Sequence, residues 1–452
     1  MHASDKWRKE VMSRAGNALL WITGVIGDKP SDSSFVALIK ENWHRVQVLD
    51  LEVVDMWGHT GRIWRILRRK APNLQTLRIV TYPSYQIIQA PRQRPLFSDA
   101  AIRLRHFTTN AKFTFSPTAP WVSNLRTISF HVYHPIRIIH PLLKSTPLLT
   151  TLKLSGAPPS VPDEDSVEDA ALEELVLTPI HLPQLISLQL FHSPFKDILK
   201  LLTRIRPSSC CGLVIFAMGS TANRTDDGDN SLVDQLYEVI VEWISAFLDG
   251  RPARSLMMTS VLCEGLPTFT IQDAATIKER SLEITFNLDA RSYSALRKLA
   301  TCSGLSTVEQ LCLECVPDTG DELLPLYRAF SSVTTLIIVG CCDDVRSFHV
   351  QDDNPWCQSP IFPLLHTLEV RGSRNYPIRR FNSVGFITDF LEYRAGVGLP
   401  VLSLNLCNDT AMLLRREKQD CLRRLRQISG LVLSMPPTAI TPIEYFMNKL
   451  KI

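Results

Sequence analysis

The stretch Pro147–Gly156 reads PLLTTLKLSG, and close copies of it recur along the chain. Its apolar residues follow the spacing L-x-x-L-x-L, in which Val, Ile or Phe can replace each Leu. The last two apolar positions are two residues apart, so they lie on one side of a short strand. One such strand cannot bury its apolar side alone. The recurrence therefore predicts that many strands stack side by side around a continuous core.

The copies are spaced mostly 20 to 35 residues apart, which overlaps the period of leucine-rich repeats. Two weaker copies contain Leu104/Phe107 and Leu213/Phe216. The full copies, given by their three apolar residues, are Val46/Leu49/Leu51, Leu74/Leu77/Ile79, Leu125/Ile128/Phe130, Leu149/Leu152/Leu154, Leu172/Leu175/Leu177, Leu185/Leu188/Leu190, Val308/Leu311/Leu313, Val333/Leu336/Ile338, Leu365/Leu368/Val370, Leu399/Leu402/Leu404 and Ile428/Leu431/Leu433.

Segments with helical spacing separate several of these strands. In a helix, the segment 195–207 would place Phe195, Ile198 and Leu202 on one apolar stripe. A longer helical segment precedes Gly250 and Pro252, which are expected to stop it. Strand, helix and strand at this period predict an α/β fold. We expect a leucine-rich-repeat-like solenoid (horseshoe), with parallel strands on the concave face and helices outside.

The pattern also predicts how the chain is divided. Residues 1–45 are expected to form an N-terminal helix and a capping strand, and residues 46–250 the first half of the array. Residues 251–300 show the repeat poorly and are expected to be an irregular seam. Residues 301–452 are expected to be the second half.

The composition indicates a globular protein in a reducing compartment. The chain has 452 residues, a net charge of +4 and 45% hydrophobic residues. Its 11 cysteines are scattered and odd in number, which favours free thiols and a cytoplasmic or nuclear location. We expect no membrane partner, because the sequence has no apolar run of the length that spans a bilayer.

Signatures of catalysis, cofactor binding and metal binding are missing from the sequence. None of the motifs GxSxG, HExxH and GxxxxGK[ST] occurs. Cys312 and Cys315 form a CxxC pair inside an apolar run, where small buried side chains are the expected reading. The histidines of the segment 131–140 are expected in loops and caps. We therefore expect no enzyme, no cofactor and no metal.

The polar side of the predicted strands is the candidate binding surface. It is extended and mixed in charge, which suits recognition of a protein partner or substrate. Solvent-facing strand positions are also polar for solubility alone. Each of these residues can therefore be interpreted either as a binding contact or as an ordinary surface residue. The candidate residues on this concave face are Arg78, Ser129, Lys153, Glu174, Gln189 and Glu369.

Two basic clusters leave a nucleic acid or an acidic partner as a less favoured alternative. The favoured interpretation of both clusters is an outer helix face exposed to solvent, and aromatic residues are not interleaved with the second cluster. The clusters are Arg62, Arg65, Arg68, Arg69 and Lys70, and Arg415, Arg416, Lys418, Arg423, Arg424 and Arg426.

Two phrases near the start resemble a known family. The phrase SRAGNALLWITGVI contains Arg14, Ala15, Gly16, Asn17, Leu20 and Ile22, and ENWHRVQVLDLEV follows with Asn42, Trp43, His44 and Arg45. In this order, and followed by many P-x-L-x-x-L-x-L units, they resemble the F-box/leucine-rich-repeat proteins of mushroom-forming fungi. Leu19 stands where the family often has Pro.

The resemblance implies a substrate-recognition part of an F-box-type ubiquitin ligase receptor. The F-box opens with an L-P-x-E-[IL] phrase, which has no counterpart in the sequence given. The chain is therefore expected to be truncated or to be a relative without an F-box. The adaptor subunit of a cullin-type ligase is an expected partner only if an F-box lies upstream. A stand-alone leucine-rich-repeat scaffold without a ubiquitin role is the alternative.

Overall fold

The computed structural model describes residues 5–27, 30–54, 59–82, 96–111, 116–131, 134, 136–156, 178–191, 195–208, 211–216, 229–251, 253–263, 266–273, 282–287, 290–314, 320–339, 360–371, 383–407, 411 and 419–435. The chain divides into two compact units, 1–236 and 237–452, and the division falls inside helix α6 (Asp229–Gly250). Both units are α/β, with a mostly parallel sheet.

The N-terminal unit contains a parallel sheet whose strand order follows the chain, β1-β2-β3-β4-β5-β6-β8-β10. A small parallel sheet of β7 and β9 lies beside it. The elements are α1 (Asp5–Ala15), β1 (Leu20–Ile26), α2 (Pro30–Glu41), β2 (Val46–Val54), α3 (His59–Leu67), β3 (Thr76–Tyr82), β4 (His106–Thr109), β5 (Thr127–Phe130), α4 (Ile136–Lys144), β6 (Thr151–Ser155), β7 (Ile180–Leu182), β8 (Ser187–Phe191), α5 (Phe195–Leu202), β9 (Ile205–Pro207) and β10 (Gly212–Phe216).

The C-terminal unit combines an antiparallel segment with parallel strands. Strands β11, β12 and β13 pair antiparallel inside the region 251–300, where the sequence repeat is weak. Strands β11, β14, β15, β16, β17 and β18 then pair in parallel. The elements are β11 (Ser255–Cys263), β12 (Leu266–Asp273), β13 (Glu283–Asn287), α7 (Ala290–Leu299), β14 (Gln310–Glu314), α8 (Leu324–Ala329), β15 (Thr335–Val339), β16 (Thr367–Arg371), α9 (Ser383–Gly396), β17 (Ser403–Leu406), α11 (Gln419–Gln427) and β18 (Val432–Ser434).

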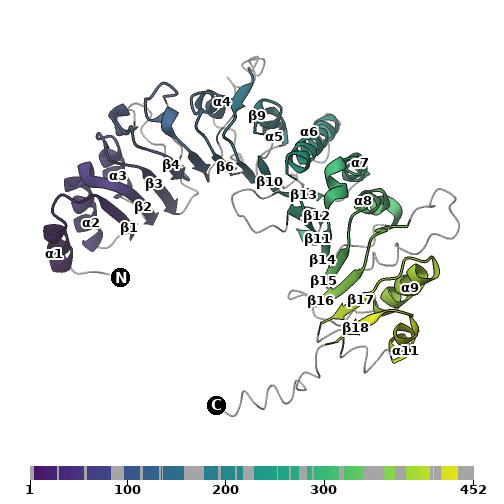
Figure 1. Cartoon of the computed structure of the whole chain (residues 1–452). Helices are drawn as coiled ribbons and strands as arrows, with labels where there is room; N and C mark the ends of the chain where they lie inside the picture. Colours follow the sequence, from purple (N-terminus) through teal and green to yellow (C-terminus); the bar gives the residue numbers. More distant parts are fainter. Residues whose placement is uncertain are drawn as a thin grey trace, which may run out of the picture. The chain divides into compact units, whose positions relative to one another are not determined.

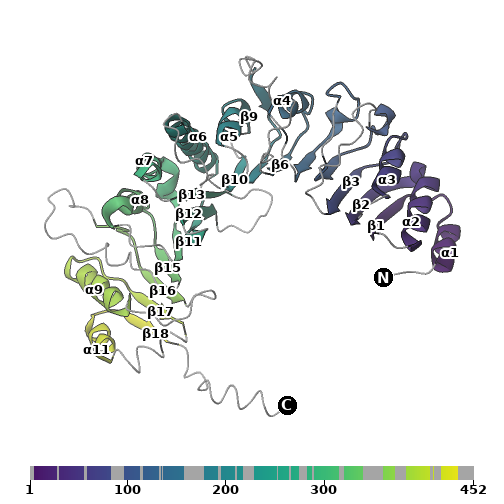
Figure 2. The same cartoon turned by 180° about the vertical axis from the view of Figure 1, so that it is seen from behind.

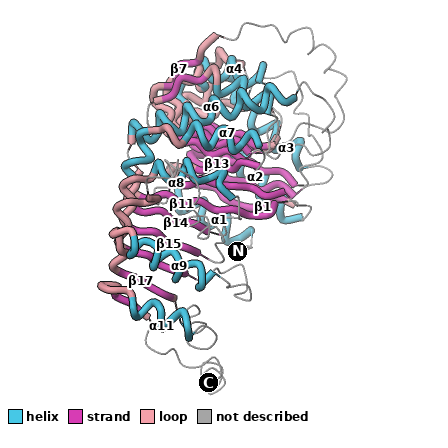
Figure 3. The backbone as a smooth tube through the Cα atoms, turned by 90° about the vertical axis from the view of Figure 1, so that its right-hand side faces the viewer, coloured by secondary structure: helices cyan, strands magenta, loops and turns pink. Residues whose placement is uncertain are grey.

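The helices of each unit lie on one side of its strands. Figures 1 and 2 show α2 and α3 beside β1–β3 in the N-terminal unit, and α8, α9 and α11 beside β14–β18 in the C-terminal unit. Figure 3 shows β14, β15 and β17 stacked in chain order with α9 and α11 alongside. No described helix lies on the opposite side, which we call the helix-free face of each unit.

The repeated apolar residues form the core between strands and helices. In the N-terminal unit Leu77, Phe107, Ile128, Leu152 and Leu188 stand in register on successive strands, and each is at most 1% exposed. Burying a side chain of this size contributes about 2 kcal/mol relative to leaving it exposed. The shared side of the strands therefore supplies the core that the sequence pattern predicts.

A repeated backbone contact fixes the start of each strand. The amide of Thr127 donates to the Arg105 carbonyl at 3.0 Å, and the amide of Thr151 donates to the Arg126 carbonyl at 3.0 Å. The same step occurs in the other unit, where the Thr335 amide donates to the Glu309 carbonyl. In these three cases the first amide of a strand binds the carbonyl of the residue just before the neighbouring strand. This contact keeps the side chains of the two strands in register.

One copy of the phrase was predicted in the wrong register. Leu402 was expected to point into the core, but it precedes β17 and is 49% exposed. The buried triplet is Val401, Leu404 and Leu406, and Leu404 pairs with Leu368. Residues 402, 404 and 406 lie on the same side of an extended chain. Leucine spacing alone therefore could not show whether the buried pair is 402 and 404 or 404 and 406.

Candidate functional site

One row of side chains crosses the helix-free face of the N-terminal unit. It joins positions in register on six neighbouring parallel strands, about 4.8 Å apart. Because the backbones are hydrogen-bonded to one another, the spacing of the row is fixed. The row consists of Asp50, Arg78, Thr108, Ser129, Lys153 and Gln189. Register therefore brings together four of the candidate residues predicted from the sequence.

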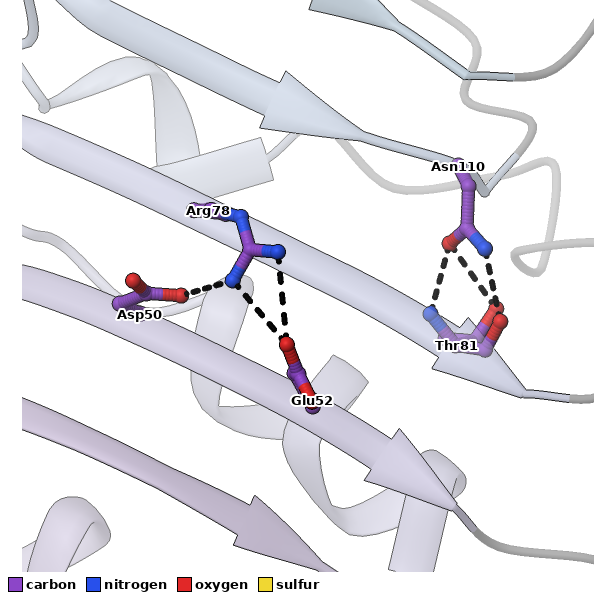
Figure 4. Close-up of polar contacts among 5 residues, drawn as sticks. All are labelled: Asp50, Glu52, Arg78, Thr81 and Asn110. Atoms are coloured by element: carbon purple, nitrogen blue, oxygen red, sulfur yellow. Dashed lines mark hydrogen bonds and ion pairs between the residues drawn. The ribbon is translucent and has the colours of Figure 1, made fainter. Parts of the chain in front are cut away.

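Arg78 joins two acidic residues of the neighbouring strand β2 (Figure 4). Its Nη1 lies 2.7 Å from Asp50 Oδ1, and its Nη2 lies 3.4 Å from Glu52 Oε1. The hydrogen bond to Asp50 is the main reason that the pKa of Arg78 is raised. Its side chain is 39% exposed, so solvent weakens these contacts. The cluster holds the guanidinium in place and carries a net negative charge.

His131 lies at the end of β5, beside the row. Its Nε2 is 3.2 Å from Ser129 Oγ, and its Nδ1 is 3.3 Å from Ser155 Oγ. Burial lowers the pKa of His131, and the nearby charges of Lys153 and Arg78 lower it further. The imidazole is therefore neutral at pH 7. Ser129 is only 6% exposed, and its hydroxyl lies within hydrogen-bonding distance of His131.

Lys153 is held by a neighbour on the adjacent strand, and Gln189 by a neighbour on its own strand. The Lys153 ammonium lies 5.0 Å from the centroid of the Phe191 ring, which is a cation–π arrangement. The Gln189 Nε2 donates to Ser187 Oγ at 3.3 Å. Ser187 is only 2% exposed, so solvent reaches Lys153 and Gln189 but not Ser187.

Large apolar side chains are exposed on the first three strands of the N-terminal unit. Trp21 on β1 is 76% exposed, and Tyr82 on β3 is 47% exposed. The Trp21 Nε1 donates to Gln47 Oε1 at 2.9 Å, which restrains the indole. Val25 and Val54 are also exposed on β1 and β2. Exposed Trp and Tyr side chains with few rotatable bonds are frequent centres of binding energy in protein interfaces.

The C-terminal unit has its own row on its helix-free face. Glu369 stands in register between Ile337 and Asn405, and it accepts hydrogen bonds from Arg371 at 2.9 and 3.1 Å. Cys312 belongs to the same row, and burial is the main reason that its pKa is raised to about 11. Glu369 is thus neutralised by Arg371, and its row is less charged than the row of the N-terminal unit.

The remaining predicted residue and the overlooked residues can now be placed. Glu174 lies outside the described residues. Sequence reasoning did not select Asp50, Glu52 or Trp21. Alignment of the Leu49 phrase with the Leu77 phrase would have paired Asp50 with Arg78, because the register of the core leucines is also the register of the polar row.

The second basic cluster is partly neutralised within the protein. Arg424 on α11 pairs with Asp389 Oδ1 at 2.6 Å and with Glu392, both on α9. Arg423 pairs with Asp420 at 3.1 Å. Residues 415, 416 and 418 lie outside the described residues. Arg424 therefore joins α11 to α9, whereas Arg423 pairs within α11.

Metal sites, membrane-spanning helices and similarity to known proteins were also considered. Within the described ranges, no group of three or more His, Cys, Asp or Glu side chains could hold a metal ion. No described helix combines the length and apolar character needed to cross a bilayer. Comparison with known proteins returned no matching family model and no significantly similar curated protein.

Proposed function

We propose that the chain is a protein–protein interaction solenoid of leucine-rich-repeat-like units, and that the helix-free face of its N-terminal unit binds a protein partner. The row of Asp50, Arg78, Ser129, Lys153 and Gln189 in strict strand register carries this proposal. Ser129 contributes to the row as a buried support, and the other four present their polar groups.

The chemistry of this surface suits a folded protein or an extended peptide. The row carries one negative charge at Asp50 and positive charges at Arg78 and Lys153, and each charged group is held by a neighbour. Side chains fixed in advance lose less conformational entropy when a partner binds. Trp21, near the start of β1, and Tyr82, at the end of β3, supply exposed apolar area on either side of the charged cluster along the strands. Such an aromatic and charged combination is typical of protein interfaces.

We further assign this surface to substrate recognition in an F-box-type ubiquitin ligase receptor. The support is the resemblance of the two opening phrases around Arg14–Ile22 and Asn42–Arg45. In the structure the first phrase spans the end of α1 and β1, and the second immediately precedes and enters β2. An interaction scaffold without a ubiquitin role uses the same surface, so the two readings differ in the other proteins of the complex.

Affinity purification of the tagged chain from its own cells, followed by mass spectrometry, tests the proposal. The doubly substituted variant Lys153→Glu with Gln189→Lys should lose the specific partner, because it places a negative charge where the row is positive and a positive charge where it is neutral. A matched control is Arg206→Glu, which changes an exposed residue of β9 in the same unit. Retention of the partner by the double variant, or equal loss in the control, would contradict the proposed surface.

The same experiment separates the two readings of the complex. Recovery of a cullin and its adaptor with the parent chain would support the ligase assignment. If a specific partner is recovered without these subunits, and its recovery depends on Lys153 and Gln189, the chain is a scaffold of a different kind.

A further inference from the structure

A basic groove lies between α2 and α3 in the N-terminal unit, away from the helix-free face. Its volume is about 320 Å³. Val36 and Ile66 form an apolar floor and are at most 4% exposed. The remaining lining residues are Ser33, Ala37, Lys40, Arg62, Arg65 and Arg69, so the described lining contains four cations and no carboxylate.

Two of the arginines on this groove, Arg62 and Arg69, donate hydrogen bonds to neutral groups. Arg62 Nη1 donates to Ser33 Oγ at 3.3 Å, and Arg69 Nη1 donates to the Lys40 carbonyl at 3.1 Å. These contacts orient the guanidinium groups without cancelling their charge. The contrast with Arg424 is direct, because that arginine also bridges two helices but bonds to two carboxylates. The groove thus retains positive charge where the α9–α11 junction does not.

The spacing of the cations restricts the chemistry of an occupant. Arg62 and Arg65 are three residues apart on α3, and Arg69 follows four residues later, so they form one edge of the groove. Lys40 lies on the α2 edge. A guanidinium pairs well with a planar carboxylate through two parallel hydrogen bonds. The apolar floor adds a site for an aliphatic side chain. An acidic peptide that also contains leucines has both the carboxylates and the aliphatic side chain.

A peptide fits this lining better than a nucleic acid. Binding of a single strand normally uses aromatic side chains on which bases stack. None of the residues that line the groove is aromatic. Its floor instead offers Val36 and Ile66, which suit an aliphatic side chain.

We propose that the α2–α3 groove binds an acidic peptide segment, with carboxylates on Arg62, Arg69 and Lys40 and an aliphatic side chain over Val36 and Ile66. This recognition is independent of the interaction surface on the helix-free face. It would let the chain hold a second protein, or a second segment of the same partner, while the first surface is occupied.

Fluorescence anisotropy with a labelled peptide Glu-Glu-Leu-Glu-Glu-Leu-Glu-Glu tests this proposal on the full chain. The same peptide with every Glu replaced by Gln is the neutral probe. The acidic peptide should bind with saturation and at least tenfold more tightly than the neutral one. Affinity should fall as salt rises, because exposed charges are screened.

Three variants locate the binding. Arg62→Glu with Arg69→Glu should weaken the acidic peptide at least tenfold. Arg423→Glu with Arg426→Glu makes the same charge change on α11 and should alter affinity less than twofold. Ala37→Trp keeps all cations and fills the groove from the exposed Ala37 position, so it should also weaken binding at least tenfold. Circular dichroism establishes that each variant is folded.

Specific outcomes overturn the proposal. Equal weakening by the α11 variant would show diffuse attraction, and unchanged binding by Ala37→Trp would place the peptide elsewhere. If binding does not saturate up to 1 mM peptide, the groove is not a specific site for an acidic peptide. Tighter binding of a ten-nucleotide oligo-thymidine, or of vesicles containing phosphatidylserine, would assign the groove to a different class of ligand.

Discussion

The side-chain amide of Asn110 forms two hydrogen bonds with the backbone of Thr81. Its Nδ2 donates to the Thr81 carbonyl at 2.7 Å, and its Oδ1 accepts from the Thr81 amide at 2.7 Å (Figure 4). Asn110 follows β4, so its side chain satisfies the backbone of β3 where the paired register of the two strands has ended. Thr81 is 4% exposed, so water does not readily replace these bonds.

Replacement of Asn110 should therefore destabilise the N-terminal unit. Asn110→Ala leaves a buried amide and a buried carbonyl without partners, which costs about 1–3 kcal/mol. Asn110→Asp should cost a similar amount, because a carboxylate would face the Thr81 carbonyl. The half-buried Asn124, which donates one bond to the Ile102 carbonyl at 3.0 Å, provides the control Asn124→Ala. Urea unfolding measures both, and a larger loss at Asn124 would contradict this account.

Leu152→Asp should destabilise the protein by several kcal/mol, because it places an unpaired charge in the core between Ile128 and Leu188. In a stacked array the effect should extend to neighbouring strands. Lys153→Asp introduces the same residue one position later, on the helix-free face, and should change stability by about 1 kcal/mol or less. Hydrogen exchange of β5 and β8 measures the spread. Equal protection in the two variants would show that Leu152 is not a core residue.

Gly304 allows α6 to approach the turn before β14 in the C-terminal unit. A Cβ at Gly304 would lie 3.0 Å from the carbonyl carbon of Leu248, and still closer to the Leu248 Cβ. Gly304→Ala should therefore destabilise this unit by about 1–3 kcal/mol through overpacking. Gly385 in α9 has open space at its Cβ, and Gly385→Ala should stabilise by about 0.5–1 kcal/mol. Thermal unfolding of the pair tests this, and effects of the same sign would contradict it.

The sequence predicted the parts of the structure that repeat. Leu49, Leu77, Leu152 and Leu336 could be assigned to strands because each copy of the phrase obeys the same period-two rule. The α/β class followed from the helical spacing between copies. At Leu402 the rule was insufficient, because a shift of two residues keeps the same side of the strand and changes only its neighbours.

The candidate sites were less accessible to sequence reasoning. Arg78, Lys153 and Gln189 could be placed on one face by alternation, but alternation does not show that Ser129 is covered by its surroundings. The α2–α3 groove was visible only as a basic cluster around Arg62. Its lining also requires Ser33 and Lys40 from another helix, and a tertiary contact of this kind leaves no periodic signal.

Cys211 should make the protein less stable as the pH rises above 9. The thiol precedes β10, is 4% exposed, and burial raises its pKa from 9.0 to about 12. Between these values the folded thiol keeps its proton and the unfolded thiol loses it. The unfolded state then binds fewer protons, so stability falls with rising pH at up to about 1.4 kcal/mol per pH unit. The stabilising effect of burying the neutral thiol is fully present below pH 9 and is lost progressively toward pH 12.

Comparison of the parent with Cys211→Ala isolates this thiol from the other groups that titrate in the same range. The difference in unfolding free energy between the two proteins should shift by about 1.4 kcal/mol between pH 8 and pH 10, in favour of the variant. Native Cys211 should also react slowly with iodoacetamide at pH 8, since the thiolate is the reactive form. A pH-independent difference together with rapid alkylation would mean that solvent reaches the Cys211 thiol and that its pKa is close to 9.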